Sequence, residues 1–196
     1  MTAVLAFCHG LGRINGALLA LGRWIGAGCM ALMVIAILVQ VFFRYVLNNA
    51  LPWPEELARF LMLWATGLMI PTAYRRSGFV SIEVLSRLLP RVVGAVLALV
   101  LGFLALVLLV KGAQIGWNEV TGFSGRAETD SLRVPASLAF DRWVKLPKWT
   151  MMLSLVVGLV LMIAVNIELM LRQIIALSGH DDRLKPIPDT VSLGAE

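Results

Sequence analysis

The chain has 196 residues, of which 59% are hydrophobic and only 15% charged, and its mean hydropathy is +0.85. A soluble domain carries about 25% charged residues, so this composition excludes an ordinary water-soluble protein and indicates one that lies in a lipid bilayer. The net charge of +5 does not indicate nucleic-acid binding, because the basic residues stand singly between apolar runs and form no basic stripe.

The first predicted element is an amphipathic helix ahead of the first membrane span. Its apolar residues recur at spacings of three and four, which places them on one face of a helix. They are Val4, Phe7, Leu11, Ile14, Leu18, Leu21 and Ile25. We expect this interfacial helix to lie along the membrane surface, or to pack on a partner, before the chain turns into the bilayer.

Four apolar stretches are long enough, or nearly so, to cross a hydrocarbon core of about 30 Å, which takes roughly 20 helical residues. They lie at about 24–43, 57–74, 92–110 and 149–171. In lipid every backbone polar group needs an internal partner, so all four must be helical. The predicted fold is therefore an all-α membrane protein, with one four-helix domain over residues 1–175. Pro71 should kink the second span or mark its last turn.

Two further segments lie outside the predicted spans. The longest connection, 111–148, is mixed in charge, and we interpret it as a partly ordered loop with a short helix near Ser137–Val144. Residues 176–196 contain proline, glycine and charge without periodicity, which predicts a flexible tail.

The basic residues bear on the orientation of the chain. An even number of spans places both termini on one side of the membrane. That side would carry nine basic residues and the other side eight, so the totals do not decide the orientation. The two shortest connections differ more, because 75–91 carries four arginines and 44–56 carries only Arg44. The positive-inside rule then favours termini in the cytoplasm.

The predicted spans contain no ionisable residue near their middle. A channel or secondary transporter presents polar groups to its solute near the midplane of the bilayer. Here Arg59 lies one turn into the second span, and Glu168 lies near the end of the fourth with Arg172 four residues on as its helical partner. We interpret most of the remaining polar residues as hydrogen-bonding groups between helices. They are Gln40, Thr66, Ser154 and Asn166.

The same inventory argues against an enzyme and against a bound cofactor. Both histidines, His9 and His180, lie outside the spans, so no haem site is predicted. Cys8 and Cys29 form no CxxC motif and predict neither a metal site nor a disulfide framework. With no hydrolytic triad or phosphate-binding loop, the sequence predicts a protein that functions by contact with others.

One region resembles a known family. The stretch LPWPEELARFLMLWATGLMIPTAYRRSGFVSIEVLSRLLP (51–90) resembles the signature region of the small, Q-type membrane subunit of tripartite ATP-independent periplasmic (TRAP) transporters. The order of spans and RVPASLAFDRWVKLP before the last span also fit. Phe79 stands near the place where the family often has histidine, and Glu83 where it often has aspartate. The matching residues are Trp53, Glu55, Glu56, Arg59, Arg75, Arg76, Val80, Ile82, Glu83, Leu89 and Pro90.

The resemblance implies a partner-dependent function in the bacterial inner membrane, with both termini cytoplasmic. Such subunits pair with a large M-type subunit that holds the substrate and sodium sites, and a periplasmic binding protein delivers the substrate, typically an organic acid. The small subunit is thought to brace the large one and to help dock the binding protein. Two alternatives stay open: a stand-alone four-helix scaffold or anchor of another complex, and a small transporter that builds its pathway between identical protomers.

Glu55 and Glu56 have two interpretations. In the first turn of a helix they stabilise the positive end of its dipole, and Pro54 suits a first helical position. Alternatively Glu56, with Arg59 close by on the same face, makes a polar contact with the large subunit at the periplasmic boundary. An arginine in the apolar zone needs an acidic partner, which is Glu55, Glu56 or an acid of the other subunit. The full set proposed for this contact is Trp53, Glu55, Glu56, Arg59 and Glu83, although Trp53 also fits an interfacial belt and Glu83 could pair locally with Arg87.

Two other groups of charged residues are candidates for function. Arg75 and Arg76 are predicted to anchor the cytoplasmic end of the second span. Four residues of the long connection are candidates for docking the binding protein, the alternative being a solvated loop with no partner. They are Arg126, Arg133, Asp141 and Arg142.

Overall fold

The computed structural model describes residues 2–49, 51–77, 91–135 and 143–177. Its long helices are Thr2–Tyr45 (α1), Trp53–Ser77 (α2), Arg91–Thr121 (α4) and Trp149–Leu177 (α6). A one-turn helix, Phe123–Arg126 (α5), and two antiparallel strands, Glu128–Pro135 (β1) and Trp143–Pro147 (β2), join α4 to α6. All four long helices contain a window apolar and long enough to cross a membrane, which confirms the predicted all-α membrane fold.

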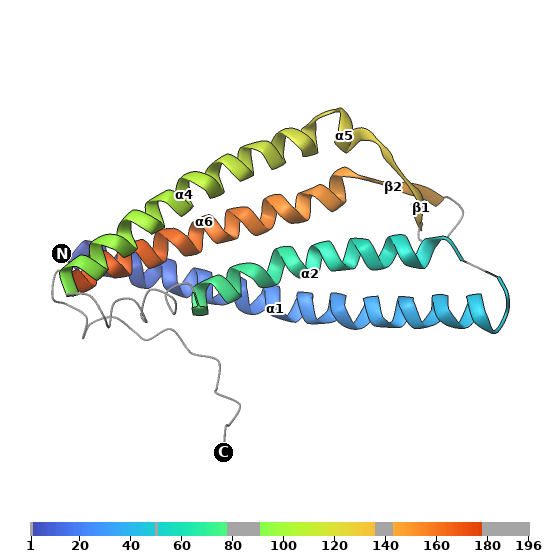
Figure 1. Cartoon of the computed structure of the whole chain (residues 1–196), viewed down its shortest axis with the longest axis horizontal. Coiled ribbons are helices and arrows are strands. Elements are labelled where there is room, and N and C mark those ends of the chain that lie inside the picture. Colours follow the sequence, from blue (N-terminus) through green and yellow to red (C-terminus); the bar gives the residue numbers. More distant parts are fainter. Residues whose placement is uncertain (1, 50, 78–90, 136–142, 178–196) are drawn as a thin grey trace, which may run out of the picture.

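The long helices form two pairs (Figure 1). α1 packs mainly on α2, α4 packs on α6, and the contact between α2 and α6 joins the pairs. The two strands lie at the end of the bundle away from the N-terminus, close to the start of α2 (Figure 1). At the other end, the first part of α1 lies near the last part of α6, and these two helices are also in contact.

The N-terminal segment is helical, but it does not turn before the first span. α1 is one unbroken helix of 44 residues, so the predicted change of direction near residue 24 is wrong. The predicted apolar face points outward, since Phe7, Ile14 and Leu21 are each about 60% exposed. The face that packs inward instead carries Cys8, Asn15 and Leu19.

The two helix pairs meet at a pair of glycines. A Cβ atom added at Gly67 of α2 would lie 2.5 Å from the carbonyl oxygen of Ser154, and one added at Gly158 of α6 would lie 2.7 Å from that of Gly67. No side chain fits in that space, so the backbones of α2 and α6 approach each other directly, as at other small-residue contacts between membrane helices.

The long connection is more regular than the sequence predicted. α4 continues ten residues past Lys111 to Thr121, because a fall in hydropathy ends a membrane span but does not end a helix. Trp143 and Val144 lie in β2 and not in the predicted short helix, whose other residues fall outside the described part of the chain. α2 likewise runs through Pro71 to Ser77. α6 reaches Leu177, two residues into the predicted tail, and the rest of that tail also lies outside the described residues.

Candidate functional site

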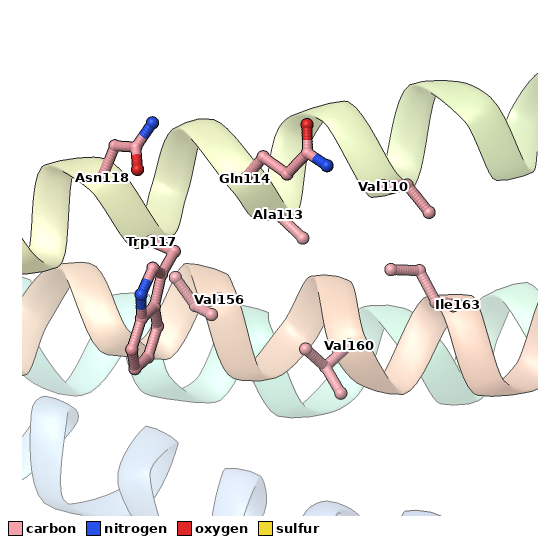
Figure 2. Close-up of a pocket in the computed structure, with 8 residues that line it drawn as sticks. All are labelled: Val110, Ala113, Gln114, Trp117, Asn118, Val156, Val160 and Ile163. Carbon is pink, nitrogen blue, oxygen red and sulfur yellow. The ribbon is translucent and has the colours of Figure 1, made fainter.

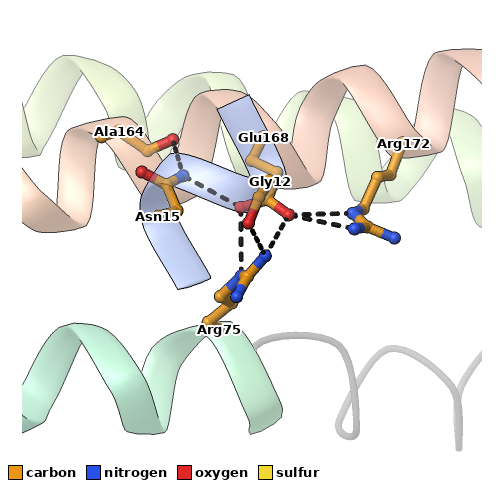
Figure 3. A network of polar contacts seen from close by, with 6 residues as sticks. All are labelled: Gly12, Asn15, Arg75, Ala164, Glu168 and Arg172. Carbon is orange, nitrogen blue, oxygen red and sulfur yellow. Dashed lines mark hydrogen bonds and ion pairs between the residues drawn. The ribbon is translucent and has the colours of Figure 1, made fainter. Parts of the chain in front are cut away.

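A buried carboxylate joins three helices near the end of α2 (Figure 3). The Glu168 side chain of α6 is fully buried. The Arg75 guanidinium of α2 donates from Nη2 to Oε1 at 2.7 Å and from Nε to Oε2 at 3.0 Å. Asn15 of α1 donates from Nδ2 to Oε2 at 2.9 Å, and Arg172 donates from Nε to Oε1 at 3.1 Å. A buried charge is tolerated when it is paired and hydrogen-bonded in this way.

The absence of a side chain at Gly12 brings α1 against this cluster. Arg75 Nη2 also donates to the backbone oxygen of Gly12 at 2.9 Å. A Cβ atom at this position would lie 3.0 Å from Glu168 Oε1 and 3.5 Å from Arg172 Nη2. A larger residue would therefore push α1 away from the carboxylate, so the glycine sets how closely the three helices meet.

A second polar contact brings in the remaining helix. The Tyr74 hydroxyl of α2 donates to Oδ1 of Asn166 in α6 at 2.8 Å, and Asn166 Nδ2 donates to the backbone oxygen of Gly102 in α4 at 2.9 Å. Asn166 thus forms hydrogen bonds between helices, as the sequence predicted. Ser154 does not fit that prediction, since its hydroxyl donates to the Met151 carbonyl within α6.

At the opposite end of the bundle, the two adjacent glutamates have different partners. Glu55 lies 3.4 Å from Arg59, and both side chains are about two thirds exposed. Glu56 instead accepts a hydrogen bond from the backbone N–H of Leu132 in β1, at 2.8 Å. The acid beside Arg59 is therefore Glu55, while Glu56 ties the start of α2 to the strands. Trp53 begins α2 and is 39% exposed.

The other predicted residues are dispersed. Arg76 lies in the last turn of α2, and Arg126 ends α5 and is exposed. Arg133 of β1 lies opposite Lys145 of β2 in the register of the two strands. Glu83, Asp141 and Arg142 lie outside the described residues. The structure therefore brings together Arg75, Glu168 and Arg172, of which the sequence predicted only the pair within α6.

A groove of about 560 Å³ runs between α4 and α6 (Figure 2). Val110 and Ala113 of α4 face Val156, Val160 and Ile163 of α6 across it. The amides of two further lining residues, Gln114 and Asn118, point away from α6. The groove is thus apolar between the helices, and such a surface suits an acyl chain or another helix better than a charged solute. Within the described ranges, no group of three or more His, Cys, Asp or Glu side chains could hold a metal ion.

The cluster could have been predicted only in part. Glu168 is the one acid in the last apolar run, and an acid in that setting needs more partners than the single arginine four residues on. Asn15 gave a further signal, because it interrupts a segment rich in small and apolar residues. Nothing local to Arg75 shows that it faces a residue 93 positions away.

These features define a multi-pass membrane protein whose buried polar side chains hold its own helices together. The family model described as tripartite ATP-independent periplasmic transporters, DctQ component, matches residues 33–176. The chain belongs to this family, which is a transporter component and comprises TRAP small permease subunits.

A curated relative agrees with that assignment. The chain is 29% identical over 103 residues to a protein of Haemophilus influenzae described as a TRAP transporter small permease protein. The alignment covers 49% of this chain and 64% of the relative, which is less than two thirds of its length. No solved structure matches the chain.

Proposed function

We propose that this chain is the accessory small permease subunit of a sodium-driven TRAP transporter for organic-acid uptake. In that role it lies in the bacterial inner membrane with both termini in the cytoplasm, braces the large M-type subunit and helps dock the periplasmic binding protein. Membership of the family and the resemblance of residues 51–90 support this role.

The close contact of α2 with α6 is the observation that carries the proposal. At Gly67 and Gly158 the two backbones leave no room for a Cβ atom, so a solute cannot pass between these helices. The buried Glu168 carboxylate is saturated by Arg75, Arg172 and Asn15 and offers nothing to a cation or an organic acid. A bundle of this kind is suited to supporting another chain, which holds the solute.

The N-terminal half of α1 supplies a surface for the large subunit. A helix of 44 residues is about 66 Å long, roughly twice the hydrocarbon core of about 30 Å. The outward residues Phe7, Ile14, Leu18 and Leu21 continue an apolar face well beyond the length that one crossing requires. Exposed apolar surface of this extent is typical of a contact with lipid or another protein, and we assign it to the large subunit.

The opposite end supplies the polar contacts. Trp53, Glu55 and Arg59 have exposed side chains, so they suit a contact with the large subunit. Glu56 holds β1 in place, and the strands and their neighbours then form the surface for the binding protein. Glu83, Asp141 and Arg142 lie outside the described residues, and we propose them from the sequence alone: Glu83 for the large subunit, and Asp141 and Arg142, with Arg126 and Arg133, for the binding protein.

Co-purification and transport test the proposal directly. The chain is expressed with a large M-type TRAP subunit, purified in detergent, and reconstituted with a TRAP binding protein and a sodium gradient. We expect one complex, and uptake only when all three proteins are present. Sodium-linked uptake into liposomes by this chain alone, or a chain that never associates with the large subunit, contradicts the assignment.

Two substitutions separate the roles at the polar end. Arg59→Ala should reduce the amount of large subunit that co-purifies. Glu56→Gln should leave the complex intact but lower uptake at limiting binding protein, because it weakens the hydrogen bond to Leu132. The control Lys111→Ala with Glu119→Ala removes one charge of each sign from exposed positions of α4 and should change neither readout. Wild-type behaviour of both single variants would refute these two contact roles.

A further inference from the structure

A small cavity with basic walls lies between α1 and α2, beside the Glu168 cluster. Its volume is about 60 Å³. A cavity needs about 10–15 Å³ of such space to hold one water molecule, so there is room for a small oxyanion. The lining residues are Gly16, Leu19, Ala20 and Arg23 of α1, and Thr72, Arg75 and Arg76 of α2.

The cavity has more positive charge than the described helices neutralise. Arg75 shares Glu168 with Arg172, so that carboxylate already faces two guanidinium groups. Arg23 and Arg76 form no ion pair with any carboxylate in the part of the chain that the structure describes. α1 contains no acidic residue, and the two of α2, Glu55 and Glu56, lie in its first turn, at the far end.

One lining residue of this cavity, Thr72, carries a buried hydroxyl group. Thr72 is 8% exposed, and its Oγ1 has no hydrogen-bond partner among the described residues. A buried polar atom without a partner is unfavourable, and most native structures avoid it. An oxygen atom bound in the cavity would accept a hydrogen bond from this hydroxyl.

We infer that this cavity binds the phosphate group of an anionic phospholipid. Arg23 directly precedes the first apolar span of the sequence and Arg76 follows the second, which places the cavity at the boundary between membrane and water. Beside Arg23, the Trp24 side chain is 80% exposed, and an acyl chain can lie against it. Basic pockets between membrane helices bind anionic headgroups in this way.

Native mass spectrometry of the full-length chain in detergent tests the inference. The chain is titrated with phosphatidylglycerol and, as the uncharged comparison, phosphatidylcholine; inorganic phosphate is added in a separate arm. We expect the wild-type chain to prefer phosphatidylglycerol. Arg23→Gln with Arg76→Gln should weaken that binding by roughly five-fold for each arginine removed.

Two further variants separate this site from general charge and from folding defects. Arg13→Gln with Arg44→Gln removes the same charge from exposed positions of α1 and should keep the preference. Thr72→Val removes the unpartnered hydroxyl at nearly constant volume, so it should weaken phosphatidylglycerol binding without lowering the stability of the lipid-free chain.

The outcomes distinguish the source of the phosphate group. Loss of the preference in the Arg23 and Arg76 variant, or in Thr72→Val if that double variant fails to fold, supports the lipid site. An unchanged preference in the variants that fold overturns it. Inorganic phosphate that binds at least as tightly as phosphatidylglycerol and displaces it also overturns the lipid assignment, in favour of a soluble oxyanion.

Discussion

Glu168→Gln is the most informative single change in the bundle. Glutamine keeps the size of the side chain but removes its charge, which leaves Arg75 and Arg172 facing each other with side chains only 10% and 17% exposed. Removing one partner of a buried ion pair costs about 3–5 kcal/mol. Since each kcal/mol shifts the melting temperature of a chain of this size by about 2–4 °C, we expect a fall of roughly 6–20 °C.

Tryptophan fluorescence of the purified chain during heating in mild detergent measures this change. Glu55→Gln is the matched control, because the pair with Arg59 is exposed and contributes about 0–1 kcal/mol. Exchanging the charges, Arg75→Glu with Glu168→Arg, should recover part of the lost stability relative to either single change. If Glu168→Gln melts no lower than Glu55→Gln, the cluster does not stabilise the bundle.

Two further changes test the helix contacts by the same melting assay. Gly67→Val should destabilise the chain by about 1–3 kcal/mol, since its side chain meets the Ser154 carbonyl, whereas Gly28→Ala, with open space around it, should be neutral or stabilising by up to about 1 kcal/mol. Equal melting temperatures for these two variants would show that α2 and α6 do not approach as described. Tyr74→Phe should cost about 0.5–1.5 kcal/mol through the lost hydrogen bond to Asn166, and a double-mutant cycle with Asn166→Ala that shows no coupling would contradict that contact.

The membrane helices were predictable because a single physical quantity defines them. A run of about 20 apolar residues is required to cross the bilayer, and the four runs in the sequence lie within the four long helices. Hydropathy does not define where a helix ends, however. α4 therefore passes Lys111 without a break, and α1 extends through residues that are less uniformly apolar than the span itself.

The contacts between distant residues were not predictable from the sequence. The pair of Glu168 with Arg172 follows from helical spacing, and the structure confirms it at 3.1 Å. The positions of Arg75 and Asn15 depend on how three helices cross, which no local pattern records. The strands were missed for a similar reason, since β1 is stabilised by pairing with β2 and by Glu56 more than by its own composition.

The two short strands have a mechanical consequence for the bundle. Their chain is continuous with α4 and α6, while the bond from Leu132 to Glu56 fastens them to the first turn of α2. A force applied to the strands is therefore transmitted to both helix pairs, and it does not separate one pair from the other. The strands connect the two helix pairs at this end of the bundle. A protein bound to the strands would therefore transmit force to both pairs together.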